Sequence, residues 1–168
     1  MEIYHGSNTA VSDPLAQAGR RNLDFGRGFY TTRLKSQAQK WALLIASRKK
    51  NTQGVITTYE LNEECLASGE YVYKNFPVYD MEWLDFVVAC RNGRDETNYD
   101  IVEGGVANDQ VIDTVEDYEN HRITAEQALD QLNFKKPNNQ ICFRRQEIID
   151  KYIHFKNAET VRKEDVSL

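Results

Sequence analysis

Hydrophobic and polar positions follow two different periods along the chain, and segments of the two kinds alternate. Short segments rich in β-branched and aromatic residues are typical of strands, and they cover residues 1–5, 28–32, 54–61, 99–103, 140–143 and 152–155. Segments with apolar residues three and four positions apart are typical of amphipathic helices, and they cover residues 36–50, 80–90, 109–118, 124–132 and, as a single turn, 147–151. This alternation predicts a mixed α+β domain.

Two of the expected helices carry signals beyond their period. The apolar face of the helix at 80–90 is expected to pack in the core, and it consists of Trp83, Phe86, Val87 and Cys90. Thr124 is expected to be the N-cap of the helix at 124–132. Glu126 and Gln127 follow it in a pattern that we interpret as falling just short of a capping box.

The length and composition suit one globular domain. The chain has 168 residues, of which 40% are hydrophobic and 11% aromatic, and no internal repeat or Pro/Gly-rich linker interrupts it. A chain of this length buries one sizeable core. We expect a single domain over residues 1–156, followed by a polar C-terminal tail over residues 157–168.

Charge and cysteine usage exclude some classes of protein. The formal net charge of -5 argues against broad binding to nucleic-acid phosphates. The three cysteines are scattered and show no metal-ligand spacing, so no metal site is expected; they are Cys65, Cys90 and Cys142. The opening residues lack the pattern of a signal peptide, and no apolar run is long enough to span a membrane. A reduced, cytosolic setting is expected.

Three short segments carry candidate chemistry. They are YHGS at 4–7, FGRGFYTT at 25–32 and NNQICF at 138–143. Each segment alone has a simpler structural explanation. His5 can bond to nearby backbone, the glycines of GRG suit a turn, and Tyr30 suits a core aromatic with its hydroxyl at the rim.

Together, in this order, the three segments resemble the ADP-ribosyltransferase superfamily, in the class named for a His-Tyr-Glu triad. That class includes diphtheria toxin and the poly(ADP-ribose) polymerases. YHGS is similar to its first strand, GRGFYTT to its second, SQAQKW at 36–41 to the helix that follows, and NNQICF to its late strand. Within the superfamily the chain resembles a bacterial branch that shares its ANDQ-like stretch at 107–110. The resemblance implies a split, mostly antiparallel sheet with flanking helices and an NAD⁺ cleft between its halves.

The resemblance implies which residues hold the nicotinamide end of NAD⁺. Tyr30 and Trp41 would clasp the cationic ring between two aromatic faces. Gly6 would let the carboxamide approach the backbone. Gly28 lies in the Gly-x-Gly motif at the start of the strand that carries Tyr30. No metal takes part.

Other residues would hold the rest of NAD⁺. His5 would bond a ribose hydroxyl, and Ser7 would orient His5 or touch the carboxamide. Arg20 or Arg21 would meet the adenine or the pyrophosphate, because a guanidinium suits phosphate geometry. The implied catalytic residues are therefore His5 and Tyr30, together with the residue at the place of the glutamate.

Gln140 occupies that place and is the main departure from the family pattern. A glutamine amide can bond the ribose 2′-hydroxyl but brings no negative charge to an oxocarbenium-like state. Slower single transfer, an acid from elsewhere such as Glu103 or Asp109, and loss of catalysis all remain open. Polymer elongation is not expected.

Three further polar residues beside glycines are candidates for the acceptor side of the cleft: Glu103, Asn108 and Asp109. The simpler interpretation is that Asn108 or Asp109 caps the helix that follows.

The resemblance thus implies a mono-ADP-ribosyltransferase that uses NAD⁺ and modifies a macromolecular acceptor, protein or nucleic acid. Small bacterial members of the superfamily act as toxins or in conflict between phage and host, which implies a neutralising antitoxin partner. Two alternatives remain: a catalytically inactive NAD⁺-binding or interaction module, and an NAD⁺ glycohydrolase.

Overall fold

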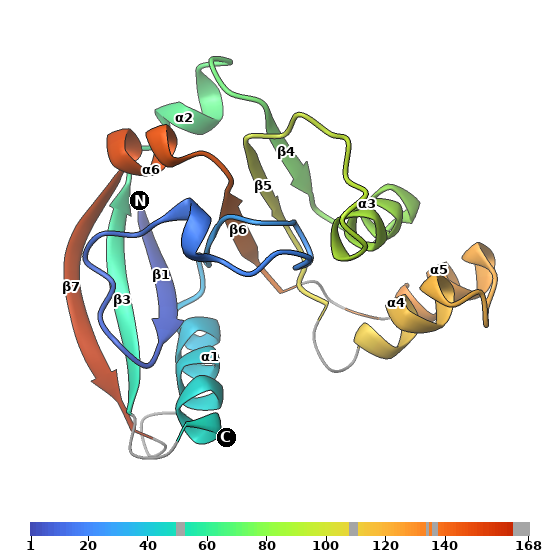
Figure 1. Ribbon diagram of the computed structural model, residues 1–168, viewed down its shortest axis with the longest axis horizontal. Coiled ribbons are helices and arrows are strands. Elements are labelled where there is room, and N and C mark those ends of the chain that lie inside the picture. The colour runs from blue at the N-terminus through green and yellow to red at the C-terminus, as the bar shows by residue number, and fades with distance from the viewer. Residues whose placement is uncertain (50–52, 108–110, 134, 136–137, 163–168) are drawn as a thin grey trace.

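Two sheets and a set of flanking helices form the molecule (Figure 1). The structure, a computed structural model, describes residues 1–49, 53–107, 111–133, 135 and 138–162. Its strands are β1 (Glu2–Ser7), β2 (Phe29–Thr31), β3 (Gly54–Leu61), β4 (Tyr73–Phe76), β5 (Ile101–Gly104), β6 (Gln140–Phe143) and β7 (Ile153–Val161). Its helices are α1 (Lys35–Arg48), α2 (Glu64–Ala67), α3 (Met81–Arg91), α4 (Ile112–Glu119), α5 (Ala125–Leu132), α6 (Gln146–Tyr152) and a 3₁₀ turn at Ala16–Ala18.

The sheet is split into two parts. One has the strand order β1-β3-β7 and is antiparallel throughout. The other has the order β2-β6-β5-β4, in which the β4–β5 pair is parallel and the others are antiparallel. A bridge joins them, in which Tyr4 and Thr32 exchange two backbone hydrogen bonds of 2.9 Å. The predicted α+β class with a split, mostly antiparallel sheet is confirmed.

Helices lie against each part of the sheet. α1 packs on β1 and β3, whereas α4 and α5 lie side by side at the end of the molecule far from β7 (Figure 1). The contact between α1 and β1 depends on Gly6, because a Cβ there would collide with the carbonyl oxygen of Ala38 and lie 2.9 Å from the Ala42 nitrogen. The Gly6 position therefore admits α1 directly over the strand.

Hydrophobic residues cover both faces of the sheet β2-β6-β5-β4. Val102 and Cys142 face a cluster that includes α3, and Ile101, Ile141 and Phe143 face a second cluster on the other side. The predicted apolar face of α3 is buried in full: Trp83, Phe86, Val87 and Cys90 are at most 6% exposed. Cys142 on β6 is a free cysteine and is buried as well.

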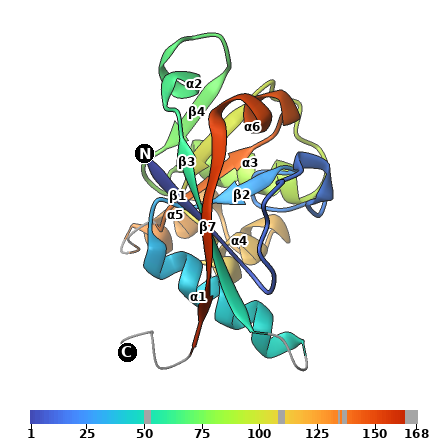
Figure 2. The same cartoon turned by 90° about the vertical axis from the view of Figure 1, so that its left-hand side faces the viewer.

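β7 is longer than the sequence predicted, and β4, the short helix α2 and the 3₁₀ turn were not predicted. β7 continues to Val161, although we expected the strand to end at Phe155 and a tail to begin at residue 157. Of its added residues, 156–160 are exposed and Val161 is buried. They form the end of β7 that leads to the C-terminus (Figure 2), and residues 157–161 pair with β3 through the backbone, which needs no apolar side chains on the exposed positions. β4 was not predicted, because its segment YKNF has a mixed polar sequence and gains its pairing from β5.

Thr124 is the N-cap of α5, as predicted, but the expected near miss was wrong. The cap is a complete capping box. The backbone nitrogen of Gln127 donates to the Thr124 hydroxyl, and the backbone nitrogen of Thr124 donates to the side-chain oxygen of Gln127. The helix begins at Ala125, so Gln127 is its third residue, which is where the motif requires it.

None of the helices in the described part of the chain has both the length and the hydropathy of a membrane span.

Candidate functional site

The three residues expected to form the triad lie on three neighbouring strands. His5 is on β1, Tyr30 on β2 and Gln140 at the start of β6. Tyr30 pairs with Cys142, two residues beyond Gln140, and side chains alternate along a strand. Tyr30 and Gln140 therefore point to the same face of the sheet.

His5 is anchored to β2 through its ring. Its Nδ1 lies 2.7 Å from the carbonyl oxygen of Tyr30, and its ring packs 4.9 Å from that of Phe29. A carbonyl oxygen only accepts, so Nδ1 carries the proton and Nε2 is an acceptor in the neutral ring. Burial lowers the pKa of His5 below its ordinary value of 6.5, which keeps the ring neutral at pH 7.

The Tyr30 hydroxyl is tied to the loop that precedes its strand. It donates to the carbonyl oxygen of Gly26 at 2.5 Å and accepts from the backbone nitrogen of Phe25 at 3.1 Å. Burial raises the pKa of Tyr30, so its hydroxyl stays protonated. Gly26 has φ +74°, a conformation that favours glycine and turns the loop back over the sheet.

Gln140 bonds to the same loop through Asp24, a residue that the sequence analysis missed. Gln140 is 3% exposed, and its Nε2 lies 3.5 Å from Asp24 Oδ2 and 3.4 Å from the carbonyl oxygen of Gly105. Asp24 also accepts from the backbone nitrogen of Ala107 at 2.9 Å and from Arg91 at 3.4 Å. Burial raises the pKa of Asp24 above its ordinary value. The one signal in the sequence was its place directly before FGRG.

Glu103, expected on the acceptor side, instead lies in a closed network on the opposite face. It pairs across the sheet with Ile141, so its side chain points away from that of Gln140. Arg33 binds both of its carboxylate oxygens, at 2.5 and 2.9 Å, Tyr73 donates at 2.7 Å and Asn139 at 2.8 Å. Every strong acceptor position is thus used within the protein, and no local sequence pattern indicated these partners.

The remaining glycine and serine candidates line the strands beside the triad. A Cβ on Gly28 would collide with Cys142 Sγ, so this glycine allows β2 to approach β6. Ser7 ends β1 and lies opposite Val55.

The other candidates are less closely connected to the triad. Trp41 is half-buried on α1, and no ring contact joins it to Tyr30 among the described ring pairs. Arg20 and Arg21 are exposed, and neither forms an ion pair with a carboxylate among the described residues. Asn108 and Asp109 lie outside the described residues.

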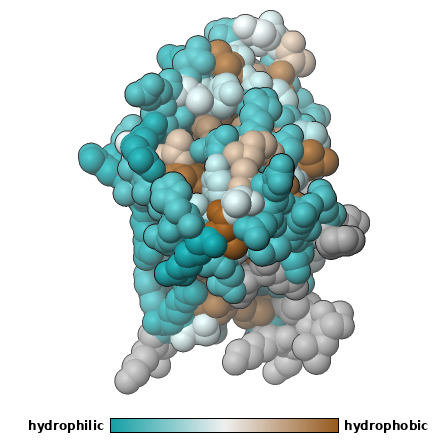
Figure 3. All heavy atoms as spheres, turned by 90° about the vertical axis from the view of Figure 1, so that its right-hand side faces the viewer, coloured by the Kyte–Doolittle hydropathy of each residue, from teal (hydrophilic) through white to brown (hydrophobic). Residues whose placement is uncertain are grey.

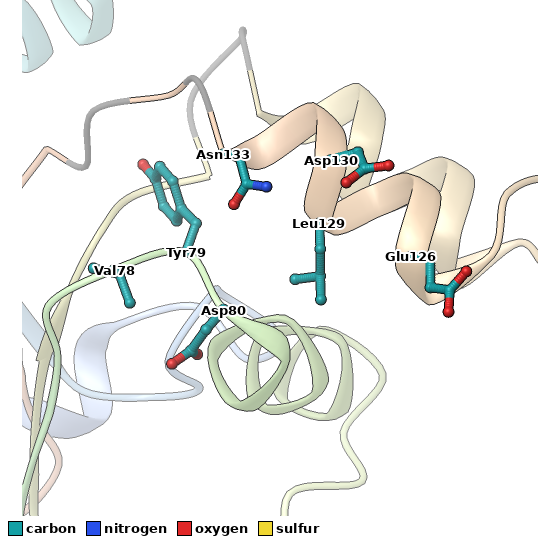
Figure 4. Close-up of a pocket in the computed structure, with 7 residues that line it drawn as sticks. All are labelled: Val78, Tyr79, Asp80, Glu126, Leu129, Asp130 and Asn133. Carbon is teal, nitrogen blue, oxygen red and sulfur yellow. The ribbon is translucent and has the colours of Figure 1, made fainter.

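Two pockets lined by described residues lie away from the triad. One of about 660 Å³ opens between α5 and the loop before α3, beside Tyr79 and Leu129 (Figure 4). A smaller one of about 310 Å³ lies between α1 and β7. The face that carries α3, α4 and α5 is mainly hydrophilic, with its apolar residues in small groups (Figure 3). Within the described part of the chain, no group of three or more metal-binding side chains occurs.

The geometry thus combines a neutral histidine whose second ring nitrogen is an acceptor, a protonated tyrosine and a buried amide beside a carboxylate. Comparison with curated proteins and with solved structures found no match. One protein family, described as "Protein of unknown function (DUF3990)", matches residues 1–155. This match covers the two sheets up to the first part of β7 and includes all three triad positions, so the chain belongs to the DUF3990 family.

Proposed function

We propose that this protein is a mono-ADP-ribosyltransferase, which binds NAD⁺ and transfers its ADP-ribose group to a macromolecular acceptor. The observation that carries the proposal is the adjacency of His5, Tyr30 and Gln140 on three neighbouring strands at the split in the sheet. These residues come from distant parts of the chain, and one face of β2 and β6 carries two of them. The three segments that resemble the ADP-ribosyltransferase superfamily thus meet at a single place.

Each side chain has a role in this reaction. Nε2 of neutral His5 accepts a hydrogen bond from a ribose hydroxyl, because Nδ1 is already committed to the carbonyl of Tyr30. Tyr30 offers one aromatic face to the nicotinamide ring, and Trp41 is proposed to offer the other. The amide oxygen of Gln140 accepts from the 2′-hydroxyl. No metal is required for these contacts.

The reaction itself is a substitution at the ribose carbon C1′. The bond from C1′ to the nicotinamide nitrogen breaks, and its electron pair leaves with nicotinamide. An oxygen or nitrogen of the acceptor then bonds to C1′ and gives up its proton to solvent. Positive charge on the ribose peaks between these two events, as in glycoside hydrolysis, and acceptors placed near the 2′-hydroxyl stabilise it.

The acceptor is a macromolecule, either protein or nucleic acid. The superfamily resemblance supports single transfer, because the glutamate linked to elongation is replaced by Gln140. It also supports a bacterial toxin or conflict effector that acts in the cytosol and is held in check by a neutralising antitoxin.

The proposal is tested with NAD⁺ labelled on its adenine side, incubated with the protein in the presence and absence of a cell lysate. Nicotinamide release and macromolecular label are measured together. His5→Ala and Tyr30→Ala are expected to lower release by about 100-fold or more, since each removes a group placed at the reacting ribose or ring. His154→Ala is the matched control, because His154 is exposed on β7 and remote from the triad.

Three results separate the candidate functions. Label on protein or nucleic acid that both variants lose supports the transferase and identifies the acceptor class. Release without label identifies a glycohydrolase. Binding of NAD⁺ without release identifies an inactive binding module, a candidate favoured by the uncharged Gln140, and absence of NAD⁺ binding refutes the proposal.

A further inference from the structure

The surroundings of Gln140 determine how its amide is oriented. In the part of the chain that the structure describes, the amide nitrogen of Gln140 has two hydrogen-bond partners, the Asp24 carboxylate and the carbonyl oxygen of Gly105. Both are acceptors, so the NH₂ group must face them and each takes one N–H. The bonds are long, at 3.5 and 3.4 Å. Among the described residues, none donates to the remaining amide oxygen, Oε1.

Asp24 itself is held in place by fixed partners. The backbone nitrogen of Ala107 donates to Oδ2 at 2.9 Å, and Arg91 of α3 lies 3.4 Å from Oδ1. Its side chain is only 14% exposed. A charge in such a dry setting acts strongly on the dipoles beside it.

Other titratable groups face this carboxylate from neighbouring elements. They are Tyr30 on β2, Tyr79 before α3, Cys90 and Arg91 on α3 and, through Arg91, Glu116 on α4. Burial raises the pKa values of the two tyrosines and of Cys90, so those groups stay neutral. Arg91 and Glu116 offset each other in charge. Asp24 is therefore the acidic group in direct contact with Gln140.

We propose that Asp24 is a positioning residue for Gln140: it fixes the amide with Oε1 toward the ribose and polarises it, so that the pair supplies the negative potential that a lone glutamine lacks. This inference rests on the proposed ADP-ribosyl transfer. Electron density drawn toward Oε1 strengthens its bond to the 2′-hydroxyl as positive charge develops. The substitution of glutamine for the family's glutamate is then compensated by a carboxylate from another loop.

A double-mutant cycle of Asp24→Asn and Gln140→Glu tests this. In the natural background, Asp24→Asn is expected to lower kcat for nicotinamide release about 10- to 100-fold while leaving the dissociation constant of NAD⁺ within about twofold. When Gln140→Glu is present, two carboxylates adjoin and repel, which raises the pKa of one. Asp24→Asn then removes the repulsion and is expected to increase kcat. The effect of one substitution thus reverses sign.

A pH profile and a matched variant separate positioning from mere structural support. Burial raises the pKa of Asp24. The fall of kcat toward acidic pH in the natural protein should therefore reflect protonation of Asp24, and Asp24→Asn should abolish this fall. Asp24→Glu, which keeps the charge, should retain it and recover part of the rate, even where Gln140→Glu fails to fold. Asp95→Asn is the control, because Asp95 is also a buried carboxylate paired with an arginine, Arg144, but lies away from Gln140.

The outcomes are distinct. Sign reversal, or a fall of kcat toward acidic pH that Asp24→Glu retains and Asp24→Asn loses, supports the inference. Equal losses in both backgrounds, similar to those of Asp95→Asn, show a structural role and overturn it, as does an unchanged kcat. A natural protein that neither binds NAD⁺ nor releases nicotinamide refutes the proposed function, and the inference falls with it.

Discussion

At the scale of single residues, the absence of one side chain decides how close α1 comes to β1. A Cβ at Gly6 would overlap the carbonyl oxygen of Ala38, and backbone atoms of a helix cannot move individually. Gly6→Ala should therefore push α1 away from the sheet and cost about 1–3 kcal/mol of unfolding free energy. Chemical denaturation measures this loss.

Gly54 provides the matched control for that prediction. It lies on the neighbouring strand β3 beneath the same helix, but a Cβ there would approach Ala42 no closer than 3.1 Å. Gly54→Ala should cost clearly less than Gly6→Ala. Equal losses would mean that the general cost of a methyl group under α1, and not the close approach at Gly6, determines stability.

At the scale of elements, one buried carboxylate connects β5 to β4, to β6 and to the segment before α1. Burial would raise the pKa of Glu103, but hydrogen bonds from Arg33, Tyr73 and Asn139 outweigh it and lower the pKa below its ordinary value of 4.5. Glu103→Gln leaves the charge of Arg33 without its buried partner, so we expect a loss of about 3 kcal/mol. Glu63→Gln removes the exposed carboxylate 3.6 Å from Arg33 and should cost under about 1 kcal/mol.

The sign of the pH dependence follows from the lowered pKa. Glu103 contributes its stability fully above pH 4.5, the ordinary value, and the contribution is lost as the pH falls through the lower value of the folded state. Denaturation midpoints measured from pH 7 downward should therefore fall more steeply in the natural protein than in Glu103→Gln. If the midpoints of the two proteins fell in parallel, Glu103 would have the same pKa in the folded and unfolded states.

Local sequence patterns predicted most elements, because β3, β6, α3 and α5 carry their signals within themselves. Trp83 and Phe86 repeat at helical spacing, and the FGRGFY segment changes from a glycine loop to a strand within a few positions. β4 and the end of β7 were missed because their stability comes from pairing with a partner strand. The residues next to a strand in the sequence do not indicate such pairing.

The candidate site was predicted only in part, because local patterns mark individual segments but not the contacts between distant residues. His5, Tyr30 and Gln140 belong to recognisable segments, and the structure places these segments side by side. Asp24 was missed because its contact with Gln140 joins residues 116 positions apart. The closure of Glu103 within its network was missed for an equivalent reason, since Arg33 lies 70 positions from it.

At the scale of the whole molecule, the proposed site draws on both parts of the sheet, so NAD⁺ should stabilise both. At a concentration 100 times its dissociation constant, a ligand that binds only the folded state adds about 2.7 kcal/mol. Thermal unfolding should shift upward accordingly, and hydrogen exchange should slow in β1 and β3 as well as in β2 and β6. Protection confined to one part of the sheet would contradict a cleft formed by both, and Tyr30→Ala, which should weaken both effects, serves as the control.

The strand order has a consequence for synthesis of the protein. β6 is inserted between β2 and β5, although it is made after both of them. At about 5–20 residues per second, the ribosome needs roughly 6 to 23 s to proceed from Asp24 to Gln140. Until then the nascent chain has neither the central strand of this sheet nor the amide that Asp24 contacts. The proposed reaction with NAD⁺ would therefore begin only after residue 140 has been made and β6 has joined the sheet.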